Sequence, residues 1–92
     1  MNVWVVGISN ADGDSIVCVC ASKELAVKKL FHVRDELVKD WEKMLQEFPY
    51  SKEMYSEMIA ALSSDDYENW NNYPHDSPYI YETEVLKESA DG

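Results

Sequence analysis

The sequence is poor in the residues that build phosphate-binding loops, disulfide frameworks and membrane spans. Only three of its 92 residues are glycine, Gly7, Gly13 and Gly92, and neither a dinucleotide-binding nor a P-loop glycine pattern is present. Two cysteines, Cys18 and Cys20, are too few for a disulfide framework. No apolar run approaches the roughly 20 residues of a membrane-spanning helix, and no secretory signal is recognisable. The expected compartment is the cytoplasm.

Basic residues are also scarce. Eight Lys and Arg stand against eighteen Asp and Glu, which gives a formal net charge of −10. Phosphate backbones and anionic lipid surfaces repel such a chain, so direct binding to nucleic acid or membrane is disfavoured. The remaining composition, 46% hydrophobic and 12% aromatic, is that of a globular protein, and the length suits a single domain over residues 1–92. The expected partners are therefore basic proteins, cations, or surfaces that normally hold nucleic acid.

The apolar patterns predict an α+β fold. Val3–Ile8 is nearly continuous and β-branched, as in a central strand covered on both faces, and with the turn at Asp12-Gly13 it predicts a β-hairpin over 3–20. Helical periodicity predicts a long helix over 23–48 and a second over 52–63. An irregular acidic, aromatic loop over 65–78 and an alternating strand over 79–87 follow.

This ββααβ order predicts a small three-stranded sheet in which the last strand lies beside the first and both helices cover one face. Such a sheet has two open edges and an uncovered face. The exposed surface favours self-association.

The charge is distributed unevenly along the chain. Residues 1–48 carry a net charge of −2, whereas residues 49–92 carry −8. No Lys or Arg occurs in the thirty-four residues between Lys52 and Lys87. The carboxylates in that stretch are Glu53, Glu57, Asp65, Asp66, Glu68, Asp76, Glu82 and Glu84. A surface selected for solubility alone usually mixes both signs, so we take these eight as candidate partner-binding residues.

The spacing of two carboxylate pairs resembles that of phosphates. Glu53 and Glu57 are one helical turn apart, with a rise of roughly 6 Å, and Glu82 and Glu84 are about 6.6 Å apart on one strand face. Like charges at such spacing cost a few tenths of a kcal/mol per helical pair. A partner that supplies the cations would compensate for this cost. The alternative is an acidic surface that only keeps the protein in solution.

No constellation of catalytic or metal-ligating residues is complete. His32 and Glu36 form an i, i+4 pair without further ligands. Asn10, Asp12 and Asp14 begin like a calcium loop, but the glycine and glutamate that the loop requires are missing. Cys18 and Cys20 are interpreted as two reduced, buried thiols. We therefore expect a protein without catalytic activity, metal or cofactor.

Aromatic residues accompany the acidic loop. Trp70 and Tyr73 lie among Asn and Asp and are candidate interface anchors, with core packing as an equally open alternative. Tyr79 and Tyr81 are expected to fill the core beneath the helices.

In length, acidity and its lysine-free second half, the chain resembles the small phage-encoded DNA-mimic proteins, most specifically the anti-restriction nuclease proteins of the T-even phages. The resemblance covers the whole chain in size and charge and includes no diagnostic motif. It implies a homodimer whose negative surface imitates duplex DNA in the host cytoplasm. The implied target is the DNA-binding part of a modified-cytosine restriction endonuclease, with a histone-like protein as a further target.

Two other functions remain open from the sequence. One is a small ligand-sequestering or regulatory module that uses the groove between the helices and the loop around Trp70. The other is a structural or assembly protein whose acidity serves solubility.

Overall fold

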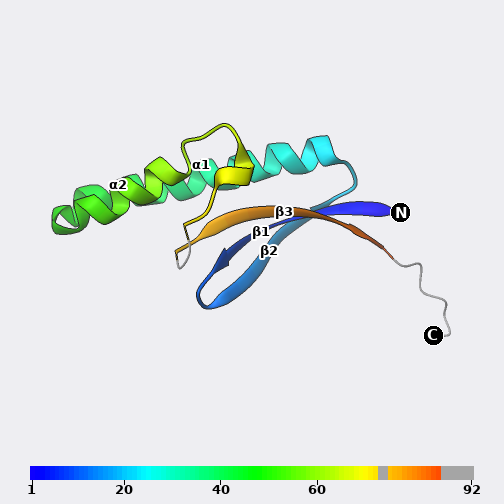
Figure 1. Ribbon diagram of the computed structural model, residues 1–92, viewed down its shortest axis with the longest axis horizontal. Coiled ribbons are helices and arrows are strands. Elements are labelled where there is room, and N and C mark those ends of the chain that lie inside the picture. Colours follow the sequence, from blue (N-terminus) through cyan, green and yellow to red (C-terminus); the bar gives the residue numbers. More distant parts are fainter. Residues whose placement is uncertain (73–74, 86–92) are drawn as a thin grey trace.

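The computed structural model describes residues 1–72 and 75–85 and has the expected α+β architecture, in the order ββααβ (Figure 1). The strands are β1 (Asn2–Asn10), β2 (Gly13–Cys20) and β3 (Ser77–Glu84). The helices are α1 (Lys23–Glu47) and α2 (Lys52–Ala61), with short 3-10 helices η1 (Pro49–Ser51) and η2 (Tyr67–Asn69).

A tight turn closes the hairpin of β1 and β2. Asn10 pairs with Gly13, and the Asn10 side-chain oxygen accepts a hydrogen bond of 2.8 Å from the backbone N–H of Asp12. Gly13 has φ of 128°, a conformation that side chains with a Cβ rarely adopt. The antiparallel register shifts between Val6 and Gly7, where β2 contains an extra residue. The predicted hairpin is present.

The third strand pairs antiparallel with the first, which gives the sheet order β2-β1-β3 that the sequence predicts. β3 begins at Ser77 and not at residue 79, and the described strand ends at Glu84. Pro78 is accommodated because β3 is an edge strand, where one side of the backbone needs no partner in the sheet.

The two helices pack side by side and are joined by a sharp turn that includes η1. Ser22 caps α1 by accepting a hydrogen bond of 3.2 Å from the N–H of Leu25. α1 ends at Glu47, one residue before the predicted end, because Pro49 cannot continue it. α2 ends at Ala61, two residues before the predicted end.

Both helices lie on the same side of the sheet (Figure 1), and α1 contacts all three strands. The core between them includes the fully buried Val6, Leu30 and Leu62. None of the described helices has the length and hydrophobicity needed to cross a membrane.

The prediction that Tyr79 and Tyr81 fill the core beneath the helices is wrong. Gly7 pairs with Tyr79 and Val5 with Tyr81, whereas the neighbouring Val6 faces the helices. Successive side chains of a strand point to opposite faces, so both tyrosines lie on the face without helices. Tyr81 is 47% exposed there.

Candidate functional site

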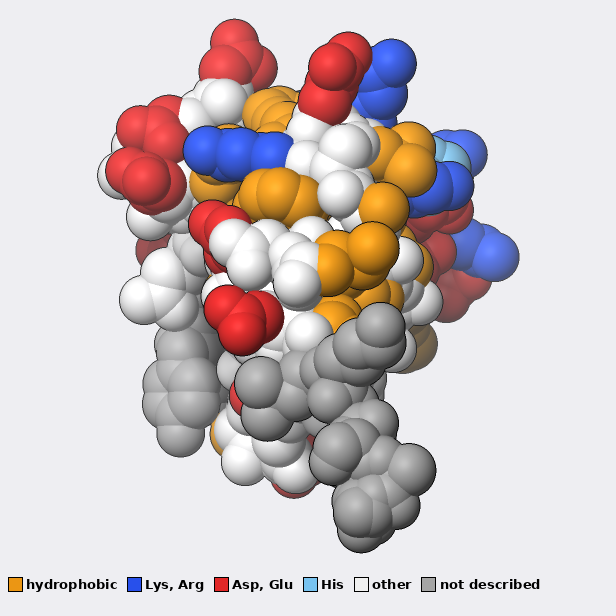
Figure 2. Space-filling model, turned by 90° about the vertical axis from the view of Figure 1, so that its right-hand side faces the viewer, with side chains coloured by type: hydrophobic (Ala, Val, Ile, Leu, Met, Phe, Trp, Pro, Cys, Tyr) orange, Lys and Arg blue, Asp and Glu red, His pale blue; other side chains and the backbone are white. Residues whose placement is uncertain are grey.

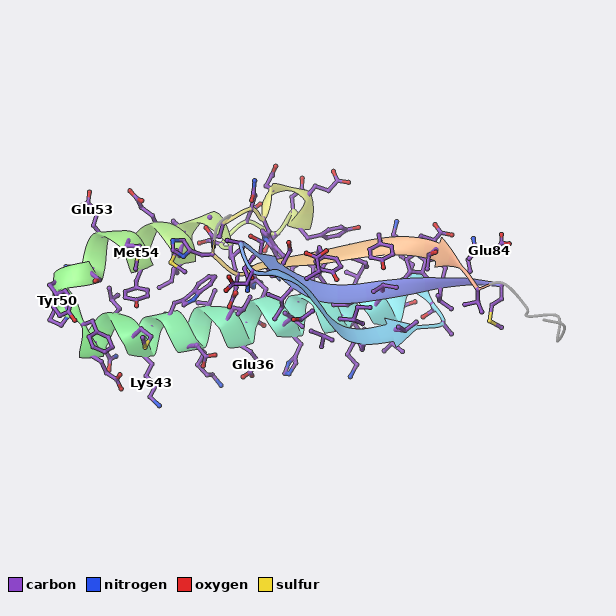
Figure 3. The ribbon with its side chains drawn as sticks, turned by 90° about the horizontal axis from the view of Figure 1, so that it is seen from below. Glu36, Lys43, Tyr50, Glu53, Met54 and Glu84 are labelled. Atoms are coloured by element: carbon purple, nitrogen blue, oxygen red, sulfur yellow. The ribbon has the colours of Figure 1, made fainter. Side chains whose placement is uncertain are left out.

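Seven of the eight predicted carboxylates are exposed on one long edge of the molecule, which we call the anionic edge. Figure 3 shows α2, the η2 segment and β3 following one another along this edge, with Glu53 near one end and Glu84 near the other. Glu36 and Lys43 of α1 lie on the opposite edge (Figure 3). The carboxylates of the anionic edge are Glu53, Glu57, Asp65, Asp66, Glu68, Glu82 and Glu84.

Local structure explains the placement of several of these side chains. Glu53 lies in the first turn of α2, where the helix dipole favours a negative charge. The carboxylate of Asp66 caps η2 by accepting a hydrogen bond of 3.0 Å from the N–H of Glu68. Glu82 accepts a hydrogen bond of 2.6 Å from the side-chain amide of Asn2. These neutral donors orient the carboxylates without cancelling their charge.

Glu82 and Glu84 share a face of β3. They pair with Trp4 and Asn2, so both side chains are directed to the helix side of the sheet. The predicted proximity of this pair on one strand face is therefore present. Both residues are exposed.

Asp76 does not belong to the anionic edge. It is partly buried, and its carboxylate accepts a hydrogen bond of 2.8 Å from the side-chain amide of Asn10 at the end of β1. This bond joins the approach to β3 to the hairpin turn. Asp76 therefore has a structural role that the sequence pattern does not distinguish from the other acids.

Within the described residues, no cation forms an ion pair with a carboxylate of the anionic edge. The ion pair found in the described part of the chain joins Arg34 to Asp35, at 2.7 Å, both on α1. Two basic residues come near the edge: Lys52 begins α2 next to Glu53, and Lys23 shares a hollow of about 220 Å³ with Glu68 and Glu82. Neither lysine forms an ion pair within 4.0 Å in the part of the chain that the structure describes. Figure 2 views this end of the molecule and shows Asp and Glu on its left flank with one basic side chain among them.

The chain's single arginine is turned inward. The Arg34 guanidinium donates hydrogen bonds of 2.6 and 3.4 Å to the carbonyls of Leu62 and Ser64, just after α2. It also lies 4.9 Å from the ring centroid of Trp70 and 5.2 Å from that of Phe31. Arg34 thereby attaches the segment after α2 to α1, and its ion pair is with Asp35 of α1 and not with a carboxylate of the anionic edge.

Trp70 is a core residue and not an exposed anchor. Its side chain is 5% exposed, packs edge-to-face on Phe31 at 5.0 Å and donates an indole hydrogen bond of 2.8 Å to the carbonyl of Ser64. Of the two alternatives for this residue, core packing is the one observed. Tyr73, the second candidate anchor, lies outside the described residues.

An exposed aromatic does occur on the anionic edge, at a position that the sequence pattern missed. Tyr50 in η1 is 84% exposed, and it lines a shallow hollow together with Glu53, Met54 and Glu57. Figure 3 shows Tyr50 at the end of the molecule where α2 begins. The signal in the sequence is Pro49, since the break in the chain prevents the following residue from continuing the buried face of α1.

The two cysteines lie side by side on the helix-facing side of β2. Their sulfur atoms are 3.8 Å apart, Cys20 is buried and Cys18 is partly exposed, and both are free thiols. Burial, with a hydrogen bond and charge interaction from Cys20, raises the pKa of Cys18 above its ordinary value, although Lys29 opposes this. The shift keeps the Cys18 thiol protonated and unreactive near neutral pH. Within the described residues no group of three or more His, Cys, Asp and Glu is placed to hold a metal ion.

The groove between the helices is small. The hollow lined by Arg34, Val38, Ile59 and Leu62 has a volume of about 230 Å³, below the roughly 300 Å³ at which ligand pockets begin. With Trp70 also packed into the core, this groove offers little to the ligand-sequestering function.

Comparison with protein-family models, curated proteins and solved structures finds no match for the chain.

Proposed function

We propose that the protein is an acidic DNA mimic that occupies the DNA-binding site of a basic DNA-binding protein. The observation that carries the proposal is the anionic edge, on which seven exposed carboxylates lie without an ion pair among the described residues. DNA-binding sites are lined with Lys and Arg and normally gain affinity by releasing counterions from phosphates. A protein with carboxylates in place of phosphates competes for such a site by occupancy, without any reaction.

The arrangement of the carboxylates supports this proposal. Glu53 and Glu57 are separated by one turn of α2, and Glu82 and Glu84 by two residues of β3. Both spacings, roughly 6 to 7 Å by helix and strand geometry, allow each carboxylate to meet a separate Lys or Arg of the partner. Tyr50 adds an exposed aromatic ring next to the first pair, and aromatic anchors are frequent among residues that dominate binding energy.

The resemblance to phage anti-restriction proteins extends the proposal to a target and a setting. On that basis the partner is a modified-cytosine restriction endonuclease of the host, with a histone-like protein as a second target. The protein then acts as a homodimer in the host cytoplasm and protects incoming phage DNA. The resemblance rests on size and charge, and both the target and the setting are taken from it.

The proposal is tested by competition with duplex DNA. The purified protein is immobilised, and the endonuclease and the histone-like protein are passed over it with and without excess duplex DNA. We expect each bound protein to be displaced by duplex DNA, since one basic site cannot hold both ligands. Binding that is unaffected by saturating duplex DNA contradicts the proposal, as does the absence of binding to both proteins.

A further inference from the structure

The sheet face opposite the helices is apolar and uncharged. Paired residues of neighbouring strands share a face, so the register defines this open face. Its residues are Val3, Val5, Gly7, Ile16, Val19, Tyr79, Tyr81 and Thr83. None is charged, although charged residues make up 28% of the chain. Asp14 pairs with Ser9 near the hairpin turn, just outside this set of residues, and is the first charged residue at that end of the face.

Several large side chains of the open face remain accessible. Ile16 is 61% exposed and Val19 is 57% exposed on β2, while Tyr81 is 47% exposed on β3. The side chains on a sheet face that meets water are normally polar. The sequence of β1 is instead continuously apolar, as in a strand that is covered on both faces. Among the described residues, however, no segment covers the open face. The open face therefore has the composition of an interface.

The face also has a defined shape. The rings of Tyr79 and Tyr81 stack at 5.9 Å with an interplanar angle of 12°, forming a ridge along β3. Tyr79 leans over Gly7, where a Cβ would collide with its ring and with the carbonyl of Ser15. Aliphatic side chains form the other rim, on β2. A two-fold axis parallel to the strands would place the tyrosine ridge of one copy against Ile16 and Val19 of the other.

We propose that the open face binds a second copy of this chain, which assigns an interface to the homodimer of the proposed function and is argued from residues outside the anionic edge. A second copy carries the same charge of −10, so two copies can meet only where carboxylates are absent. Glu82 and Glu84 point to the helix side of β3, away from the open face. A basic partner, in contrast, is attracted to the anionic edge. The uncharged face thus suits self-association better than any other part of the described surface.

The size of the face sets the strength of the dimer. Three strands about 4.8 Å apart and about 3.3 Å per residue, over roughly seven residues, span about 14 by 23 Å. Two such faces cover roughly 650 Å² in total, which is below the size of standard interfaces and fits a weak one. We therefore expect a dimer with a dissociation constant in the micromolar range, packed as two sheets face to face.

Sedimentation equilibrium of the full chain, Val19→Lys and a control His32→Lys tests this inference. Both substitutions add one positive charge, and His32 is exposed on α1. We expect Val19→Lys to weaken the dimer at least about tenfold because an ammonium group is buried without a partner, although its charge reduces repulsion. His32→Lys is expected to leave the dimer as strong or stronger. Circular dichroism checks that each variant is folded.

A second measurement needs no substitution. In the wild-type chain, the methyl NMR signals of Ile16 and Val19 are expected to shift with protein concentration, while those of Ile59 on α2 stay constant. Salt distinguishes this interface from the anionic edge: screening weakens repulsion between copies, so the dimer tightens as salt rises. A chain that stays monomeric at several hundred micromolar, or a dimer unchanged by Val19→Lys, would overturn the inference, whereas displacement of the bound partner by duplex DNA tests the anionic edge separately.

Discussion

Reversing Glu53 and Glu57 to lysine is expected to weaken binding to a basic DNA-binding partner by at least about a hundredfold. Both residues are exposed on α2, and neither forms an ion pair with any residue that the structure describes. Reversal removes two attractive contacts and adds two repulsive ones in the partner's basic site, and each such change costs on the order of 1 kcal/mol or more. Titration of the labelled partner with the Glu53→Lys/Glu57→Lys variant, at low salt, measures the loss.

The matched control is the Glu36→Lys/Asp40→Lys variant. It makes the same change in net charge at the same helical spacing, on the edge opposite the anionic edge (Figure 3). Long-range steering acts on both variants, so we expect the control to lose only a few-fold in affinity. Equal losses in the two variants would show that net charge alone attracts the partner and that the anionic edge has no special role.

Replacing Arg34 with alanine is expected to destabilise the fold by about 2–4 kcal/mol. The substitution leaves the carbonyls of Leu62 and Ser64 without their donor and removes the cation from the ring of Trp70. For a domain of this size each kcal/mol lowers the melting temperature by roughly 4–8 °C. Thermal and urea unfolding followed by circular dichroism measure the effect.

Two variants control for charge and for side-chain length. Lys39→Ala removes an exposed cation from α1 and is expected to change stability by less than about 0.5 kcal/mol. Arg34→Lys keeps the charge but lacks the planar, multi-donor group, so it should recover less than half of the loss. Full recovery by lysine would mean that the charge of Arg34 matters and its hydrogen bonds to the chain after α2 do not.

The fold was largely predictable because local patterns and tertiary packing agree. The β-branched run of β1, the turn at Gly13 and the helical spacing from Ala26 to Trp41 each specify their element. The connections from β1 to α2 are short, whereas the one from α2 to β3 is long. The errors are at element ends, where periodicity carries little information and capping decides. α2 thus ends at Ala61, although its apolar period continues to Leu62.

The candidate site was predictable in charge and less so in detail. The absence of Lys and Arg between Lys52 and Lys87 marks the anionic edge directly. The sequence places Tyr79 and Tyr81 on the wrong face of the sheet, because alternation assigns residues to two faces without showing which face the helices cover. Asp76 and Trp70 have inward partners that only the tertiary structure supplies. For the same reason the sequence shows Arg34 only as one more helix-surface cation.

The salt dependence of partner binding tests the central claim most directly, because an edge that replaces phosphates must bind through charge. Binding of the wild-type chain to the endonuclease is measured at 50 and 300 mM salt, in the absence of DNA. We predict that the dissociation constant rises at least about tenfold over this range, as for ligands that neutralise several cations. A dissociation constant that stays the same over this range would contradict the account.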